Sequence, residues 1–178
     1  MRKNGQFYYL LGLFAGDGWF QKRGISIGTK DKNRATKIAG DLEHAFQKDA
    51  KVKRRVFPDG HAIYLVSLYS VEVEGVFRRL LGNPKKDKSK NFRVPRFPNS
   101  ASKRAFVKGM FEAEAYEYVW HKMPRVAFEI FNRMAAKKIF SILRQDGIGC
   151  SFSQRKTGGC RIDITGKSNV SKFHSMYS

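Results

Sequence analysis

The sequence predicts an α+β protein made of two pseudo-symmetric halves, each with the element order αββαββα and one antiparallel sheet. Two observations carry this prediction. An apolar segment that ends in an acid occurs twice, as LLGLFAGDG at residues 10–18 and as VKGMFEAEA at residues 107–115. Similar series of helix and strand patterns then follow both copies, which indicates an internal duplication. The 178 residues suit two small units, which we place at residues 1–98 and 99–178.

The first half alternates helical and strand patterns. The predicted helices cover residues 7–17, 32–47 and 71–81, and the predicted strands cover residues 24–29, 51–57 and 61–69. Asp31 is a favoured N-cap residue for the second of these helices, and Gly82 is a favoured stop for the third. Pro58-Asp59-Gly60 makes the turn between the last two strands.

The second half repeats this order in a shorter form. Its predicted helices cover residues 103–114 and 134–145 and a short segment from Ser168, and its predicted strands cover residues 125–131, 150–156 and 160–165. Between the halves, residues 83–100 combine six basic residues with three prolines. This composition is typical of a semi-rigid linker, which we assign to the first half up to residue 98.

The charge of the chain indicates a polyanionic partner. It has 35 Lys and Arg against 15 Asp and Glu, a formal net charge of +20. Such an excess opposes folding by self-repulsion, whereas nucleic acid compensates it through counterion release. The 42% hydrophobic content excludes a disordered tail. A generic basic protein, such as a ribosomal or nucleoid protein, would carry a similar charge.

Basic side chains recur on one face of the predicted strands in both halves. Strand alternation places Lys51, Lys53 and Arg55 together, and it places Arg125 and Arg161 opposite apolar residues. The candidate DNA-binding residues are Lys51, Lys53, Arg55, Arg125, Arg155, Lys156 and Arg161. A twisted antiparallel ribbon can carry such side chains into a major groove. An ordinary solvated sheet face is the alternative.

The two motif segments have the character of buried helices. Leu10, Leu11, Leu13 and Phe14 leave no polar stripe, so the first segment needs cover on both sides. Small residues recur four apart, at Gly12/Gly16 and Gly109/Ala113, and allow two backbones to approach closely. Packing of these faces would bring Asp17 and Glu114 side by side. Two such carboxylates repel each other unless cations lie between them, and their oxygens suit Mg²⁺.

These two motifs resemble the signatures of a single-chain LAGLIDADG homing endonuclease, and the repeated element order extends the resemblance to the whole chain. The resemblance implies that the motif helices join the halves and that two saddle-like sheets straddle a long double-stranded DNA site. It implies an intron-encoded, Mg²⁺-dependent endonuclease that acts as a monomer. Such an enzyme hydrolyses both strands across the minor groove and leaves 3′ overhangs.

The resemblance also implies roles for individual residues. Asp17 and Glu114 would bind two or three divalent ions, with Ca²⁺ or Mn²⁺ able to substitute, and Gly16 and Ala113 would offer backbone carbonyls. Lys30 and Arg133 would neutralise the transition-state phosphate, and Thr29 and Asn132 would order water. Alternatively, these four residues only begin helices and anchor phosphate.

The second motif departs from the family pattern, because Ala115 replaces the final glycine. The helix would then end differently, or continue through Tyr116. We expect Glu112 to be non-catalytic, because it points to another face of the helix, and Glu117 to be a weaker substitute ligand. Trp19 and Trp120 are expected to pack beneath the sheets.

Two other functions remain open on the same fold: an RNA-binding intron maturase and a DNA-binding protein that does not cut. Retention of an acid in both motifs favours cutting. A membrane partner is not expected, since the apolar stretch at residues 7–15 is too short to span a bilayer and ends near Asp17. We therefore expect a soluble, intracellular protein.

Overall fold

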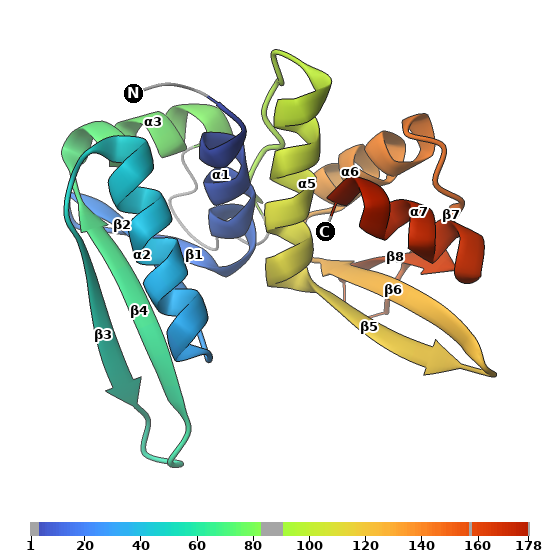
Figure 1. Ribbon diagram of the computed structural model, residues 1–178, viewed down its shortest axis with the longest axis horizontal. Helices are drawn as coiled ribbons and strands as arrows, with labels where there is room; N and C mark the ends of the chain where they lie inside the picture. Colours follow the sequence, from blue (N-terminus) through green and yellow to red (C-terminus); the bar gives the residue numbers. More distant parts are fainter. Residues whose placement is uncertain (1–3, 83–90, 157, 178) are drawn as a thin grey trace.

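The computed structural model describes residues 4–82, 91–156 and 158–177, and within them the chain forms two lobes that lie side by side (Figure 1). The first lobe contains α1 (Gly5–Asp17), β1 (Gly18–Gln21), β2 (Gly24–Thr29), α2 (Lys32–Phe46), β3 (Ala50–Val56), β4 (Ala62–Tyr69) and α3 (Val71–Leu81). The second contains α5 (Ser100–Glu114), β5 (Ala115–Trp120), β6 (Met123–Ile130), α6 (Arg133–Gln145), β7 (Cys150–Gln154), β8 (Cys160–Thr165) and α7 (Lys167–Tyr177). The predicted order αββαββα is thus confirmed in both halves. Residues 83–90 of the predicted linker lie outside the described residues.

Each lobe has one antiparallel four-stranded sheet, and the two sheets have the same topology. The strand orders are β1-β2-β4-β3 and β5-β6-β8-β7. The register also matches: Gly18 faces Ile27 in the first sheet, and Ala115 faces Phe128 in the second. The pseudo-symmetry predicted from the motifs therefore extends to individual residue pairs.

The sequence analysis assigned no residue range to two of the strands that the order αββαββα requires. β1 and β5 directly follow the motif helices. β1 has only four residues, and β5 exposes Tyr116, Val119 and Trp120. Neither strand therefore has the alternation of apolar and polar residues that marks a half-buried strand.

Local sequence signals explain where most helices begin. A side-chain oxygen at each N-cap accepts a hydrogen bond from the backbone amide three residues later. The N-cap residues are Asn4, Asp31, Ser70, Asn99 and Asn132. Such caps satisfy amides that otherwise lack a partner at a helix start. The predicted cap at Asp31 and the predicted stop at Gly82 are both present.

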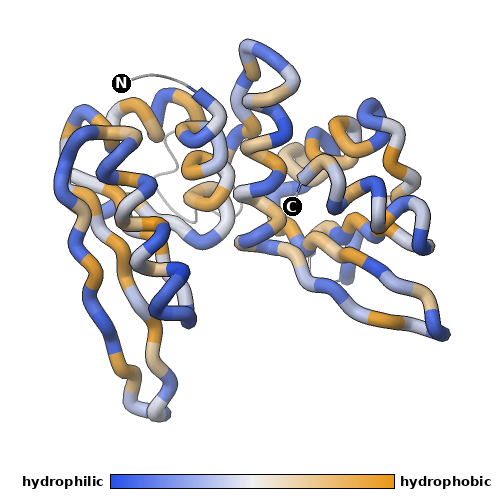
Figure 2. Tube along the Cα trace, viewed as in Figure 1, coloured by the Kyte–Doolittle hydropathy of each residue, from blue (hydrophilic) through white to orange (hydrophobic). Residues whose placement is uncertain are grey.

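The core of each lobe lies between the helices and one face of the sheet. Ile25, Ile27, Val126 and Phe128 point to this face and are fully buried. Figure 2 shows hydrophobic residues gathered along α1, where the two lobes meet. The opposite face of each sheet, which we call the open face, is covered by no helix of the described residues (Figure 1). In the described part of the chain, no helix has the length and apolarity needed to cross a membrane.

The lobes join through α1 and α5, which run side by side (Figure 1). A β carbon on Gly12 would lie 2.1 Å from the carbonyl oxygen of Phe106, and one on Gly109 would lie 2.1 Å from the carbonyl oxygen of Tyr9. The two helices therefore touch through their backbones, which only glycine permits. The predicted small-residue packing between the motif helices is confirmed.

Candidate nucleic-acid interface and acid pair

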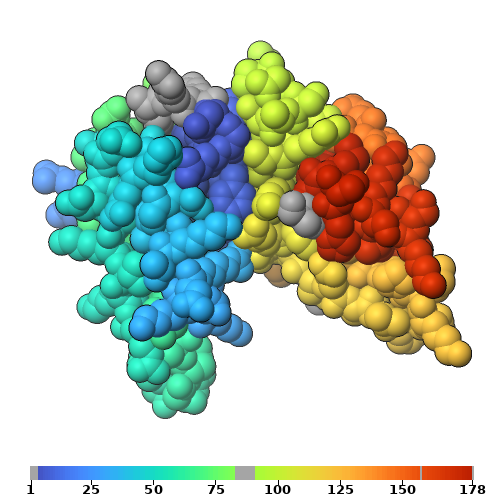
Figure 3. Space-filling view, in the orientation of Figure 1, coloured from blue at the N-terminus to red at the C-terminus, as the bar shows by residue number. Residues whose placement is uncertain are grey.

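The two motif acids end their helices at the same end of the seam between the lobes. Asp17 is the last residue of α1, Glu114 is the last residue of α5, and both are half-buried. A β carbon on Gly16 would lie 2.9 Å from Cγ and 3.4 Å from Oε1 of Glu114. The Glu114 side chain therefore lies against the opposite motif helix. Figure 3 shows an open notch between the two lobes below this end of the seam.

The second motif helix ends where the first one does, despite the missing glycine. Ala115 is the C-cap with φ −111°, and Gly18 is the C-cap with φ −96°. Neither φ requires glycine, so α5 does not continue through Tyr116. Gly18 is needed for another reason: a β carbon there would lie 2.2 Å from the Phe14 ring. In the second lobe Phe111 instead packs against Phe173 of α7.

A cavity of about 460 Å³ opens beside Asp17, where residues of both lobes line it. Thr29, Lys30, Arg34 and Glu112 are among its lining residues. Thr29 is buried and accepts a hydrogen bond from the Asp31 amide, whereas Lys30 is exposed. The structure thus brings Asp17 together with both residues predicted at the end of the strand before α2.

Arg34 and Glu112 connect the two lobes at this cavity. Arg34 Nη2 donates to the carbonyl oxygen of Glu112 at 2.8 Å, and the Tyr9 hydroxyl donates to Glu112 Oε2 at 2.7 Å. Burial, followed by the hydrogen bond to Glu112, raises the pKa of Tyr9 well above its usual range. Glu112 is therefore engaged beside the acid pair, and Arg34 is a cavity residue that the sequence pattern did not indicate.

The side chain of Asn132, for which we predicted a water-ordering role, is bonded to two backbone groups. It is buried, accepts from the Ala135 amide at 3.0 Å and donates to the carbonyl oxygen of Phe92 at 2.6 Å. Asn132 caps α6 as Asp31 caps α2, so its position is that of a cap. Arg133 is the exposed first residue of α6.

The open face of the first sheet is cationic. Strand alternation places Lys51, Lys53 and Arg55 on it, opposite Ser67, Leu65 and Ile63 of β4. All three basic residues are exposed. Trp19 lies on the same face with 37% of its surface exposed, so the expectation that it packs beneath the sheet is wrong.

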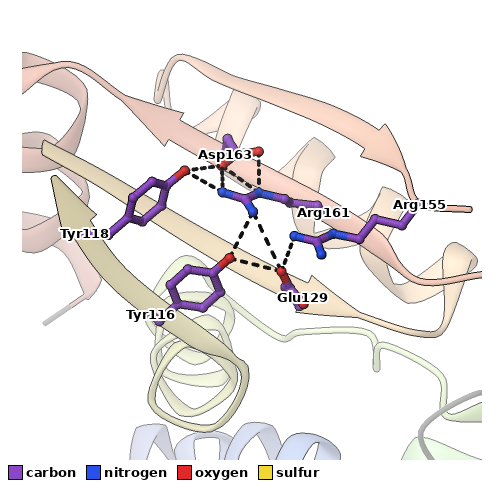
Figure 4. A network of polar contacts seen from close by, with 6 residues as sticks. All are labelled: Tyr116, Tyr118, Glu129, Arg155, Arg161 and Asp163. Carbon is purple, nitrogen blue, oxygen red and sulfur yellow. Dashed lines mark hydrogen bonds and ion pairs between the residues drawn. The ribbon is translucent and has the colours of Figure 1, made fainter. Parts of the chain in front are cut away.

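The open face of the second sheet carries a polar network centred on Arg161 (Figure 4). Arg161 Nε donates to both carboxylate oxygens of Asp163 at 2.8 Å, Nη1 donates to the Tyr116 hydroxyl at 2.9 Å, and Nη2 contacts the Tyr118 hydroxyl. Tyr116 and Arg155 both contact Glu129 Oε1, at 3.0 and 2.5 Å. The hydrogen bond to Asp163 raises the pKa of Arg161 above its usual range. Two of the candidate DNA-binding cations are therefore held by acids.

The remaining predicted residues of this lobe have varied surroundings. Arg125 is half-buried, and its Nε atom has no hydrogen-bond partner among the described residues. Lys156 is exposed just beyond β7. Trp120 is 56% exposed, so it does not pack beneath the sheet either. Glu117 lies 3.5 Å from His174 of α7, which directs its carboxylate to the helical side of the sheet.

Comparison with known proteins agrees with this geometry. Residues 4–82 match the sequence model of the LAGLIDADG-like domain. The crystal structure of I-DmoI in complex with DNA and Mn is similar at a TM-score of 0.69 and 17% identity, over 99% of this chain and 98% of that chain. The chain has the LAGLIDADG fold.

Other proteins with similar structures extend the comparison. Variants of the homing endonuclease I-DmoI are similar at a TM-score of 0.68 and 17% identity, over 97% of this chain and 95% of that chain. Full-length DUF199/WhiA from Thermatoga maritima is similar at a TM-score of 0.71 and 14% identity, over 99% of this chain. This chain spans 56% of that protein. No curated protein sequence matches the chain significantly.

In this fold the two motif acids lie at one end of the seam between the lobes. The motif helices form the junction between two pseudo-symmetric halves, as expected. The residues that the sequence pattern missed make contacts between distant segments: Tyr9 and Arg34 meet Glu112 across the seam, and Tyr116 meets Arg161 across the sheet. The only signal that the sequence held was the placement of Arg161 and Asp163 on one strand face.

Proposed function

We propose that this chain is a monomeric, site-specific endonuclease that cuts both strands of a long DNA duplex with the help of divalent metal. One observation carries the proposal: the two motif helices bring an acid from each half to the same end of the seam. A protein that only binds DNA has no need of a carboxylate from each half at this place. The net charge of +20 supports a nucleic-acid partner.

The donor set fits a hard divalent cation such as Mg²⁺. Asp17 and Glu114 supply carboxylate oxygens, and Gly16 and Ala113 supply backbone carbonyls next to them. Among the described residues, no group of three or more His, Cys, Asp and Glu side chains surrounds a common point. Mg²⁺ suits such a sparse site, because it keeps several waters and also binds phosphate oxygens. Structures of I-DmoI have been determined with Mn, Ca or Mg.

The chemistry would divide between the bound ion and the residues around it. A divalent ion lowers the pKa of a bound water and stabilises the charge that develops on phosphate. Lys30 adds a cation at the rim of the cavity beside Asp17, where it can neutralise a phosphate oxygen. Thr29 keeps its hydroxyl next to the backbone at the end of β2, and Arg34 holds α2 against α5. On the sheets, the cations of β3 would contact the DNA backbone.

A second candidate is a DNA-binding protein that does not cut. The observation that favours it is the side chain of Asn132, which is occupied by the α6 cap and by Phe92. The LAGLIDADG fold alone does not decide, since it includes both I-DmoI and DUF199/WhiA. An RNA-binding maturase would use the same open faces for structured RNA.

The test is selection of cleaved sites from a randomised duplex library with Mg²⁺ present, alongside selection of bound sites without metal. We expect one defined long site in both selections, and cleavage that EDTA abolishes. Asp17→Asn and Glu114→Gln should abolish cleavage and keep binding to that site. Asp49→Asn, at an exposed acid in the loop between α2 and β3, is the matched control and should cut normally.

Other outcomes separate the candidates. A defined bound site without any cleaved site would support the binding protein. Preference for a structured RNA over every duplex in the library would support the maturase. Full activity of Asp17→Asn would contradict the metal assignment.

A further inference from the structure

The hairpin of β5 and β6 is longer than its counterpart in the first lobe. Both β1 and β5 begin at the C-cap of a motif helix, but β1 has four residues and β5 has six. A turn of two residues then closes each hairpin. The second hairpin therefore ends in two additional cross-strand pairs, Val119 with Pro124 and Trp120 with Met123. Figure 1 shows its tip extending away from the seam.

Three of these four residues expose large apolar side chains at the tip. The exposed fractions are 70% for Val119, 56% for Trp120 and 45% for Met123. Strand alternation places Trp120 on the same face as Tyr118, which contacts Arg161 on the open face, and Met123 lies directly opposite Trp120. Val119 lies on the other face of the hairpin. Exposed apolar side chains that gather in one place mark an interaction site.

The charge around the tip indicates that the partner is nucleic acid. Residues 118–128 contain no acid, whereas Lys122 lies in the turn and Arg125 follows two residues after Met123. The apolar pair of Trp120 and Met123 also lies on the open face, which carries the predicted DNA-binding cations. An aromatic ring beside cations suits DNA, because every base has a flat face for stacking and the cations attract phosphates.

The turn holds the apolar pair at the very end of a paired ribbon. His121 and Lys122 both have positive φ, 48° and 61°, as a tight two-residue hairpin turn requires. The strands therefore stay paired up to Trp120 and Met123. The His121 ring packs edge-on against Trp120, with ring centroids 4.8 Å apart, and restricts the orientation of the indole. The two apolar side chains thus project from a rigid support and not from a loose loop.

The reach of the hairpin places this pair far from the motif acids. Six residues of strand separate Glu114 from the turn, and they span about 20 Å. This is the length of about six base pairs at about 3.4 Å each. A duplex centred on the acids would therefore meet Trp120 in the outer part of the half-site that the second lobe binds.

We propose, on the basis of the DNA binding in the function proposed above, that Trp120 and Met123 form a wedge that enters between two base pairs of this outer part. The wedge opens one base step, and the Trp120 ring stacks on a base of that step. Apolar side chains inserted in this way kink a duplex. Pyrimidine–purine steps unstack most easily, so the bound site should carry TA, CA or TG at this position.

Selection of bound sites without metal tests the wedge independently of cutting. The unmodified protein should select a pyrimidine–purine step about six base pairs from the centre of the site, and Trp120→Ala should lose that preference alone. Trp120→Ala should also weaken binding of the selected duplex by about tenfold or more. Val119→Ala is the matched control, because it removes exposed apolar surface from the opposite face of the same tip. It should change neither the preference nor the affinity.

Tryptophan fluorescence reports the stacking directly. The chain has two tryptophans, so Trp19→Phe leaves Trp120 as the single indole. Binding of the selected duplex should quench most of its emission. A duplex whose pyrimidine–purine step is replaced by AA should bind more weakly to the unmodified protein and equally well to Trp120→Ala.

The outcomes separate the wedge from the proposed function. Unchanged affinity of Trp120→Ala together with unquenched Trp120 emission would overturn the wedge and leave the nuclease function intact. Quenching on a duplex that is bound but never cut would keep the wedge and contradict only the nuclease. The absence of any defined bound duplex would overturn both. Equal losses in Trp120→Ala and Val119→Ala, with self-association of the unmodified protein, would assign the tip to a contact between copies and overturn the wedge.

Discussion

Gly12 of α1 and Phe106 of α5 are in backbone contact, with room for no side chain between them. A β carbon at position 12 would lie 2.1 Å from the Phe106 carbonyl oxygen, and one at Gly109 would lie 2.6 Å from the Leu13 nitrogen. Neither clash involves a flexible side chain that could move aside. The two lobes are therefore joined by a contact that tolerates almost no substitution.

The first prediction concerns this contact. Gly12→Ala should lower the free energy of unfolding by about 3 kcal/mol, because overpacking forces the two backbones apart. Gly75→Ala is the control, since Gly75 is an exposed residue of α3 with nothing within 4 Å of an added β carbon. The control should raise stability by about 0.5–1 kcal/mol through helix propensity. Urea unfolding of both variants measures the difference, and equal stability of the two would contradict close packing at the seam.

The second prediction separates the two open faces by their role in DNA binding. Lys53 is an exposed cation on β3, so Lys53→Gln should reduce the salt dependence of binding by about one released counterion. The double variant Arg161→Gln/Asp163→Asn removes a bonded pair without changing net charge. It should leave the salt dependence unchanged and reduce discrimination between the selected site and altered sites. Titrations of labelled duplexes at several salt concentrations measure both effects. An equal loss of salt dependence in both variants would show that Arg161 contacts DNA phosphates, as Lys53 does.

The third prediction concerns Asp146, which joins three helices of the second lobe. Lys103 Nζ lies 2.7 Å from its Oδ1, and the Tyr177 hydroxyl donates to its Oδ2 at 2.5 Å. Burial raises the pKa of this carboxyl, but the hydrogen bonds from Lys103 and Tyr177 outweigh it and lower the pKa below the ordinary 3.8. The stabilisation is therefore fully present above pH 3.8 and is lost as the pH falls through the lower pKa of the folded state.

Asp146→Asn should accordingly lower the free energy of unfolding by about 2 kcal/mol at pH 7. The difference from the unmodified protein should shrink at pH 3, because below pH 3.8 the carboxyl of the unfolded chain gains a proton before the native one does. Urea unfolding at pH 7, 5 and 3 tests this, with the exposed Asp49→Asn as the control. A difference that stays constant with pH would show that packing, rather than charge, accounts for the loss.

The fourth prediction concerns Cys150, a free thiol at the start of β7. Burial raises its pKa to about 11. Because only the thiolate reacts, alkylation by iodoacetamide should be slow at pH 7 and should rise by about tenfold per pH unit up to at least pH 9.5. Mass spectrometry of the labelled peptide follows the reaction, and Cys150→Ser removes the signal. A rate that levels off near pH 9 would indicate an ordinary thiol.

The sequence predicted the elements whose signals are local. Asp31, Gly82 and the alternation of Ile25 and Ile27 determined helix ends and a strand correctly, because caps, stops and alternation depend on neighbours in the chain. β5 was missed because its residues pack little on the helical core and meet their partners across the open face. The placement of small residues at the seam was correct, because backbone contact between helices demands glycine wherever it occurs.

The candidate site was predictable only in part, because the register in which strands pair cannot be inferred from residue types alone. The sequence matched Lys30 with Arg133, since both are basic and both precede or begin a helix. The sheet register instead makes Phe131 of the second half the equivalent of Lys30 in the first half. Similarly, arginine is a residue type that often binds phosphate, but Arg161 is bonded to Asp163 of its own strand and to Tyr116 of β5. Contacts between strands change what a basic residue is free to do.

The glycine contact at the seam has one more consequence, for the spacing of the two acids. Asp17 lies five residues beyond Gly12, and Glu114 lies five residues beyond Gly109, each within the same rigid helix. Two helices whose backbones touch cannot move closer together, so the backbone contact fixes the distance between their axes. Mutations in the core of either lobe can shift a sheet or a loop, but they leave unchanged the separation of the two helix ends that carry the carboxylates.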